Sequence, residues 1–384
     1  MRRTIMIVAG EASGDRHAAK LVEALVAEEP DTLFSFFGSA GPKMRAAGVE
    51  PSVGADGLSV VGLAEIGRAL PMFLRASRCL KNEAKQRNPD AILLVDFPDF
   101  NLKLAKALKK KGFRIIYYIS PQLWAWRRYR ISAVRKYVDL LLAILPFEKD
   151  WYLSKGVAHV EFVGNPLAKE VRATRTREEF CSDHGLDSER PIISLLPGSR
   201  HKEVTRILPV MLDSAEHIRL QVPDAQFVIA AASSSSRKDI DLSLAKRRSD
   251  IPLTIVGDET YDALGASDAA AVTSGTATLE AGIIGTPMAI VYKSSALNYF
   301  LLRPLIAVEH FGLINLIGGE RIVKEMIQDE FTPEKLSTEL LRLLQPDENR
   351  AVRAKLNAAA ERLGQGGASK RAAQAIIKFL DVPA

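Results

Sequence analysis

The sequence predicts an α/β protein of two domains, each a Rossmann-like, doubly wound parallel sheet. Short apolar runs such as 91–95 and 192–196 alternate with helical periodicities along most of the chain. These runs are apolar at every position, which is typical of strands that are buried on both faces of a parallel sheet. At 384 residues the chain is long enough for two domains, and the polar, charge-dense segment 172–190 separates two such series.

The first series of elements defines an N-terminal domain at residues 1–166. Its strands are expected at 4–8, 34–37, 91–95, 114–119, 140–145 and 160–163. The run 4–8 is too short for the apolar core of a secretory signal and fits a first strand better. Helical spacing is clearest at 17–27, 66–87 and 102–111.

The second series defines a C-terminal domain at residues 167–345. Strands are expected at 192–196, 226–231, 253–256, 269–272 and 288–292. After residue 292 the pattern changes to an apolar segment at 296–308, a loop at 311–319 and helices at 321–327 and 332–344. Residues 346–384 are expected to form C-terminal helices, interrupted near 364–367 by glycines.

Charge is distributed unevenly between the two halves. Residues 1–165 contain 25 Lys and Arg against 17 Asp and Glu, whereas the remainder contains 27 against 29, so the net charges are +8 and −2. A basic domain suits anionic lipid, a phosphorylated ligand or nucleic acid. No apolar run reaches the ~18 residues that span a bilayer, and only two cysteines are present, which suggests a reducing cytoplasm.

The sequence indicates neither a metal site nor a dinucleotide cofactor. The six histidines show no ligand spacing and form no cluster with cysteine. Gly10 and Gly14 follow the first strand, but they do not form the G-x-G-x-x-G fingerprint, and no acidic residue stands where a nicotinamide dinucleotide ribose would be bound. We therefore expect no cofactor, and Glu11 in this loop could instead contact a second substrate.

The segment 268–286 reads as a strand, a turn of small residues and a helix. Such a turn leaves free backbone N–H groups at a helix N-terminus, which suits a phosphate or diphosphate. Ser274, Gly275 and Thr276 form the turn, and Glu280 lies about one helical turn later, where it could reach a ribose hydroxyl. The alternative is an ordinary strand–turn–helix with Thr276 as the cap.

A second turn of this kind, at 197–200, follows the strand 192–196. Ser199 and Arg200 close it, and an arginine there could bind a phosphate through its guanidinium. Both turns follow strands of one predicted sheet, so we expect them to converge on one anion.

Asp96 directly follows the buried strand 91–95, at the position where open α/β sheets bind ligands. Asp99 has an alternative role as a cap of the next helix, but Asp96 has no equally simple structural role.

Two segments could meet a membrane or an acceptor. The helix 66–87 carries six basic residues, and Leu70, Met72 and Phe73 lie near one end. It is either a surface helix with a solvated basic face or an interfacial helix on anionic lipid. The segment 120–130 contains Trp124, Trp126 and Arg127, which suits stacking on nucleic-acid bases, a sugar or an acyl chain.

Seven motifs in order resemble the lipid-A-disaccharide synthase family of GT-B glycosyltransferases, in which two Rossmann-like domains face a cleft. The resemblance covers nearly the whole chain, and its first three motifs are specific. The motifs are VAGEASGD (8–15), DFPDFN (96–101), SPQLWAW (120–126), LPFE (145–148), LPGSR (196–200), SGTATLE (274–280) and NLIGG (315–319).

The resemblance implies a metal-independent, inverting transfer of 2,3-diacylglucosamine from its UDP derivative to the 6-hydroxyl of 2,3-diacylglucosamine 1-phosphate. It implies Asp96 as general base with Glu11 beside it, and Ser199, Arg200, Ser274, Gly275 and Thr276 on the diphosphate. Glu280 would bind the ribose and Asn315 the donor side. Leu70, Met72, Phe73, Trp124, Trp126 and Arg127 would meet the acceptor or the inner face of the inner membrane.

Two alternative functions and one question of assembly stay open at this point. Another UDP-sugar enzyme of the same fold, such as a peptidoglycan glycosyltransferase or an epimerase, would share the two weaker turns. A nucleic-acid-binding α/β protein would use the 124–130 segment and would retain RNA or DNA, visible as absorbance at 260 nm; we expect none. A homodimer is neither required nor excluded.

Overall fold

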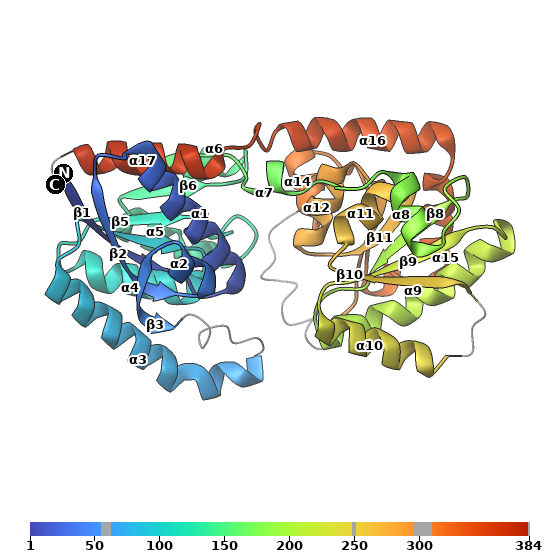
Figure 1. Ribbon diagram of the computed structural model, residues 1–384, viewed down its shortest axis with the longest axis horizontal. Helices are drawn as coiled ribbons and strands as arrows, with labels where there is room; N and C mark the ends of the chain where they lie inside the picture. Colours follow the sequence, from blue (N-terminus) through green and yellow to red (C-terminus); the bar gives the residue numbers. More distant parts are fainter. Residues whose placement is uncertain (55–62, 248–250, 295–308, 383–384) are drawn as a thin grey trace. The chain divides into compact units, whose positions relative to one another are not determined.

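The computed structural model describes residues 1–54, 63–247, 251–294 and 309–382, with the side chains of 63–69 left out. The chain forms two compact units (Figure 1). The first comprises Met1–Pro166 together with Gln365–Ala384, and the second comprises Leu167–Gly364.

The first unit is built on a parallel sheet in the order β3-β2-β1-β4-β5-β6-β7. The order reverses between β1 and β4, which makes their carboxyl ends a topological switch point. The strands are β1 (Arg2–Val8), β2 (Leu33–Ala40), β3 (Val49–Gly54), β4 (Ala91–Val95), β5 (Ile115–Tyr118), β6 (Leu140–Ala143) and β7 (Val160–Phe162).

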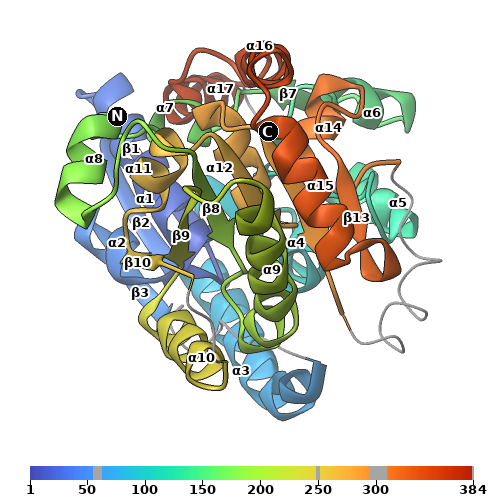
Figure 2. The same ribbon diagram turned by 90° about the vertical axis from the view of Figure 1, so that its right-hand side faces the viewer.

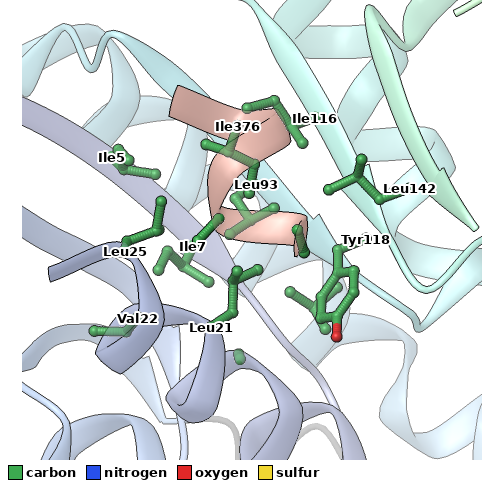
Figure 3. Close-up of a cluster of buried hydrophobic side chains, with 14 of the residues drawn as sticks. Ile5, Ile7, Leu21, Val22, Leu25, Leu93, Ile116, Tyr118, Leu142 and Ile376 are labelled. Atoms are coloured by element: carbon green, nitrogen blue, oxygen red, sulfur yellow. The ribbon is translucent and has the colours of Figure 1, made fainter. Parts of the chain in front are cut away.

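Helices cover both faces of this sheet. On one face, α1 (Ala12–Glu28) and α17 (Ala368–Asp381) pack over β1, β4, β5 and β6 (Figure 3). There Leu21 and Ile376, from opposite ends of the chain, enter the same core as Leu93. The other face is covered by α3 (Leu63–Arg87), α4 (Pro98–Lys109), α5 (Ile131–Tyr137) and α6 (Glu148–Ser154), and the short α2 (Pro42–Ala46) follows β2.

The second unit repeats the arrangement with strand order β10-β9-β8-β11-β12-β13. The strands are β8 (Ile192–Leu196), β9 (Gln226–Ala231), β10 (Leu253–Gly257), β11 (Ala269–Thr273), β12 (Met288–Tyr292) and β13 (Glu325–Ile327). One layer of helices contains α9 (His201–Gln221), with α10 (Ser234–Ala245) and α15 (Pro333–Leu343) packed against it (Figure 2). A second group contains α8 (Arg177–His184), α11 (Thr260–Ala266), α12 (Thr276–Ile284), α14 (Leu313–Gly318) and α16 (Pro346–Glu361), and α7 (Leu167–Glu170) opens the unit.

The expected strands 91–95, 192–196, 226–231 and 288–292 are confirmed to the residue. Two expectations near the C-terminal end of the second sheet are wrong. The loop expected at 311–319 contains α14, and the helix expected at 321–327 is replaced by β13, which pairs with β12 through Ile290 and Glu325. This pairing depends on tertiary context that local spacing does not contain. The segment 296–308 lies outside the described residues.

The C-terminal helices expected as one block at 346–384 are divided between the units. α16 belongs to the second unit, whereas α17 packs on α1 of the first. Gly364, Gly366 and Gly367 all have positive φ, so the helix is interrupted between α16 and α17, near the predicted residues. Among the described helices, none is both long and apolar enough to cross a membrane.

Candidate active site

Glu11 and Asp96 lie at the switch point of the first sheet. Val8 of β1 pairs with Leu94 of β4, so the residues that follow these strands emerge side by side at the carboxyl edge. Glu11 is the exposed N-cap residue of α1, and Asp96 is the first residue after β4, partly buried. The structure therefore brings together the two carboxylates expected to act on the acceptor.

The backbone of Asp96 is held in an unusual conformation. Asp96 and Phe97 have φ values of 48° and 51°, in the left-handed region that few residues other than glycine adopt. The Asp96 carbonyl accepts hydrogen bonds from Tyr117 Oη at 2.6 Å and from Asn101 Nδ2 at 2.7 Å. Asn101 Nδ2 also contacts the carbonyl of Val95 at 3.2 Å. These buried donors offset the strain of the turn and fix the direction of the Asp96 side chain.

Burial and the nearby charge of Glu11 raise the pKa of Asp96 from 3.8 to about 6, although a hydrogen bond from the Phe97 backbone acts in the opposite direction. Both main causes disfavour the charged carboxylate. A carboxyl group with this pKa is a stronger base than an ordinary aspartate and is still ionised at neutral pH. It therefore fits a general base.

The glycine-rich motif around Glu11 also contains a structural residue that the sequence did not single out. Asp15 is buried, and its carboxylate accepts hydrogen bonds from the backbone N–H groups of Gly41, Lys43 and Met44, at 2.8, 2.8 and 3.1 Å. It therefore caps α2. A Cβ at Gly41 would lie 2.5 Å from the Asp15 carboxyl carbon, which explains the glycine.

Trp124 is a core residue. It is 5% exposed, its indole N–H donates to Glu148 Oε1 at 2.9 Å, and its ring meets Phe147 edge-on. Glu148 also accepts from the backbone N–H of Leu145 at 3.0 Å. The direct contact with acceptor expected for Trp124 is therefore wrong, because its ring and its N–H are both used inside the fold. Glu148 was not predicted from the sequence as a site residue, and its pairing with Trp124 ties two of the motifs together.

Trp126 and Arg127 remain at the surface of this segment. Both are partly buried, and the Arg127 guanidinium stacks over the Trp126 ring at 4.1 Å from its centroid. A loop with one indole buried and the other covered by arginine does not offer the two stacking faces that a nucleic-acid surface would use.

On α3, the three residues expected to form an apolar tip separate into two groups. Leu70 is 53% exposed, as is Leu74 at 51%. Met72 and Phe73 instead pack against the core, and the Phe73 ring lies 6.0 Å from that of Phe97. The exposed apolar surface of α3 is therefore made by Leu70 and Leu74, with Arg75 and Arg78 exposed beside them.

In the second unit the two small-residue turns lie on neighbouring strands. Leu196 of β8 pairs with Val272 of β11, and Thr273 Oγ1 donates to the Leu196 carbonyl at 2.8 Å. The turns after these strands therefore start side by side at the carboxyl edge, at the switch point of the second sheet. The register places the two turns next to each other, and their convergence on one anion stays a prediction.

The turn at 274–276 leaves the start of α12 open. Gly275 is the N-cap residue, no side chain caps the helix, and Gly275 and Thr276 are exposed. The expected alternative, a cap by Thr276, is wrong because Thr276 is the first residue of α12. Backbone N–H groups in the first turn of a helix have no partner within it, so this end suits an anion.

The turn at 197–200 is different, because its backbone donors are already used. The Glu203 carboxylate accepts from the backbone N–H groups of Ser199 and Arg200 at 3.2 and 3.3 Å. Glu203 also pairs with the Arg200 guanidinium at 2.8 Å. What this turn can offer to an anion is therefore its side chains: that of Ser199, which is exposed, and that of Arg200, which is 67% exposed.

The two remaining candidates differ in what they can reach. Glu280 is partly buried on α12, and Tyr261 Oη donates to its carboxylate at 3.0 Å. Asn315 is fully buried, and its amide binds the backbone of Val323 and the carboxylate of Glu325. Direct contact of Asn315 with a ligand is therefore not supported, because its amide fixes the loop before β13.

Within the part of the chain that the structure describes, no group of three or more His, Cys, Asp or Glu side chains could hold a metal ion.

Comparison with solved structures assigns the fold. A UDP-GlcNAc 2-epimerase from Neisseria meningitidis bound to UDP-GlcNAc superposes with a TM-score of 0.57 at 13% identity, covering 98% of this chain and 100% of that one. The glycotransferase of kitacinnamycin gives 0.65 at 16% identity, covering 100% of both chains. At these identities the similarity defines the fold alone, which is the GT-B fold of glycosyltransferases and related epimerases.

Sequence comparison is more specific. Residues 5–379 match the model of the family described as lipid-A-disaccharide synthetase. A lipid-A-disaccharide synthase from Trichlorobacter lovleyi is 43% identical over 380 residues, covering 99% of this chain and 98% of its own. One from Geobacter sulfurreducens is 42% identical, covering 98% and 97%. The chain belongs to the lipid-A-disaccharide synthase family of glycosyltransferases, whose members use a UDP-sugar donor and a lipid acceptor.

Proposed function

We propose that this enzyme transfers 2,3-diacylglucosamine from its UDP derivative to the 6-hydroxyl of 2,3-diacylglucosamine 1-phosphate. The products would be UDP and the β(1→6)-linked disaccharide 1-phosphate, a lipid A precursor. The family membership supports the reaction class, and the observation that carries the mechanism is the position of Asp96 and Glu11 at the switch point of the first sheet.

Asp96 acts as the general base in this proposal. The acceptor 6-hydroxyl gives its proton to the Asp96 carboxylate while its oxygen attacks the anomeric carbon of the donor. The bond from that carbon to the diphosphate breaks, and the configuration inverts in a single displacement. Glu11 supports Asp96, since its charge contributes to the raised pKa.

The second unit binds the donor. The open N-terminus of α12 at Ser274, Gly275 and Thr276 and the guanidinium of Arg200 stabilise negative charge on the departing diphosphate. Glu280 binds the ribose. The solved epimerase that shares this fold is bound to UDP-GlcNAc, which supports the same class of donor here.

The enzyme lies on the inner face of the inner membrane in this proposal. Both substrates carry acyl chains, the first half of the chain has a net charge of +8 (25 basic against 17 acidic residues), and α3 exposes Leu70 and Leu74 beside basic residues.

The experiment combines the purified enzyme with both acylated sugars and detects the disaccharide by mass spectrometry. We expect one disaccharide and one UDP for each transfer. Absence of the disaccharide, together with UDP release from unacylated UDP-GlcNAc, would contradict the proposed substrates and favour another UDP-sugar enzyme of this fold.

A further inference from the structure

Three arginines gather beside the proposed general base, on the segment between β5 and α5. Arg127 Nη1 pairs with Asp99 Oδ1 at 2.7 Å, and Arg130 Nη2 pairs with the same oxygen. Arg128 is exposed between them. Two guanidiniums share one carboxylate, so the Arg127–Arg130 pair keeps a positive charge that Asp99 does not neutralise.

The local backbone is shaped to bring the two guanidiniums together. Arg127 has a φ of 52°, a left-handed conformation that is costly for a residue with a side chain. It directly precedes the 3₁₀ turn Arg128–Arg130, which returns Arg130 to the same acceptor oxygen. Burial alone would raise the pKa of Asp99, but hydrogen bonds from Arg130 and Arg127 hold it below its usual range. Asp99 is thus an anion at neutral pH that positions both arginines.

The arginines lie close to Asp96. Asp99 is in the first turn of α4, three residues after Asp96. The pKa of Tyr117 is raised mainly by burial, and the charges of Asp96, Asp99 and Arg130 all act on the same ring. That ring donates the hydrogen bond that fixes the Asp96 carbonyl. The arginine pair therefore contacts the first turn of α4, three residues along the chain from Asp96.

Aromatic rings complete the surface. Trp126 carries Arg127 on its face, and Tyr129 is 73% exposed, with the Arg130 guanidinium 6.0 Å from its ring centroid. The exposed Tyr129 ring suits the face of a sugar, whereas the planar guanidiniums suit the oxygens of a phosphate.

We propose that Arg127 and Arg130, positioned by Asp99, bind the phosphate of the acceptor and thereby select an acceptor that is phosphorylated at the end remote from its reacting hydroxyl. This deepens the proposed function and depends on it. At neutral pH a phosphate monoester carries a charge of about −1.5 to −2, which the surplus charge of the pair and the exposed Arg128 complement.

The test compares two acceptors, the 1-phosphate and the same acylated sugar with a free 1-hydroxyl. In Arg127→Ala and Arg130→Ala we expect KM for the phosphorylated acceptor to rise about 10- to 100-fold, as for a lost charge-assisted hydrogen bond. KM for the hydroxyl acceptor and for the donor should not change. Arg130→Lys, which keeps the charge without the planar fork, should give an intermediate rise, and Arg135→Ala, an exposed arginine of α5, should behave as wild type.

The affinity of wild type and variants for each acceptor is also measured by equilibrium binding. This measurement does not require turnover, so it decides the proposal even if the enzyme makes no disaccharide. The proposal would be overturned if the arginine variants lost the same affinity for both acceptors, or lost affinity for neither. Binding to phosphatidylglycerol vesicles is measured in parallel. If the arginine variants lose vesicle binding while acceptor preference persists, the arginines bind lipid head groups and the proposal is wrong. A further outcome is that the arginine variants keep the preference for the phosphorylated acceptor while Asp96→Asn abolishes transfer. That result would overturn the role of the arginines and leave the proposed function intact.

Discussion

Asp96 combines three properties in one residue: a strained backbone, partial burial and a neighbouring negative charge. Each of these properties is unfavourable to folding on its own. Tyr117 and Asn101 stabilise the turn at Asp96 by donating hydrogen bonds to its carbonyl oxygen. Strain and a raised pKa in the same residue are typical of functional sites. The sequence could indicate Asp96 from its place after a buried strand, but the left-handed turn and the role of Tyr117 depend on register between β4 and β5.

The free energy of unfolding should reveal the cost of the Asp96 charge. Because its pKa is higher in the folded protein than the ordinary 3.8, ionisation opposes folding. This cost is absent at low pH, grows between about pH 4 and pH 6, and is complete above that range. Asp96→Asn should therefore be more stable than wild type by up to about 3 kcal/mol at pH 8, with no difference at pH 3.5. Urea unfolding at several pH values measures this, and a difference that does not vary with pH would contradict it.

Tyr117→Phe should impair catalysis without impairing donor binding. Removal of the hydroxyl that donates to the Asp96 carbonyl loosens the turn, so kcat should fall about 2- to 10-fold. Asp96 should also become more solvated, so the acidic limb of the pH–rate profile should shift to lower pH. UDP affinity is the control measurement, and Tyr152→Phe is the matched variant, because Tyr152 Oη also donates to a buried carbonyl, that of Pro121. An unshifted profile would mean that Tyr117 does not position Asp96.

At the scale of elements, two motifs that stand apart in the sequence support one another. The carboxylate of Glu148, at the start of α6, binds Trp124 in the segment after β5 and the backbone N–H groups of Ile144 and Leu145. Burial raises the pKa of Glu148, and these donors oppose that rise. The tryptophans and arginines of the segment 120–130 suggest that Trp124 contacts a ligand. The burial of its ring in the structure shows instead that it is a core residue.

Glu148→Ala should destabilise the first unit by about 3 kcal/mol, because it leaves three N–H donors, two of them buried, without an acceptor. Glu148→Gln keeps one acceptor oxygen and should cost less. Thermal or urea unfolding checks both values. An alanine variant as stable as wild type would mean that water replaces the carboxylate, and that Glu148 does not hold the segment.

The α3 helix should attach the enzyme to anionic lipid through its exposed leucines. Leu70→Ser and Leu74→Ser should each weaken binding to phosphatidylglycerol vesicles about tenfold, from the loss of apolar area. Leu242→Ser on α10, where the leucine is 59% exposed, is the matched control. Cosedimentation with vesicles measures the effect. If the control weakens binding equally, or neither α3 variant does, α3 is an ordinary surface helix.

At the scale of the whole molecule, the two units share a strand order in which the direction of progression reverses once, and each places its candidate residues at that reversal. The alternation of apolar runs and helical periodicities is enough to predict two doubly wound parallel sheets, because strands buried on both faces are apolar at every position. The sequence could not show that Glu203 occupies the N–H groups of its own turn, or that Asn315 binds Val323 and Glu325, because both depend on side-chain contacts.

The return of α17 to the first unit should make that unit sensitive to the end of the chain. Ile376→Ser removes a fully buried side chain from the core of Figure 3 and should destabilise the first unit by about 2–5 kcal/mol. All three tryptophans, Trp124, Trp126 and Trp151, lie in this unit, so intrinsic fluorescence reports its unfolding alone. Limited proteolysis of the second unit is the control. An unchanged fluorescence transition would contradict the placement of α17.

The central claim is that Asp96 is the base of the transfer and that donor binding belongs to the other unit. A pH profile of single-turnover disaccharide formation, with UDP affinity measured at each pH for wild type and Asp96→Asn, tests it most directly. We expect the wild-type rate to rise through about pH 6, with the pKa of Asp96, and the variant to form no disaccharide while binding UDP as tightly as wild type. A variant that still turns over, or one that no longer binds UDP, would contradict this assignment.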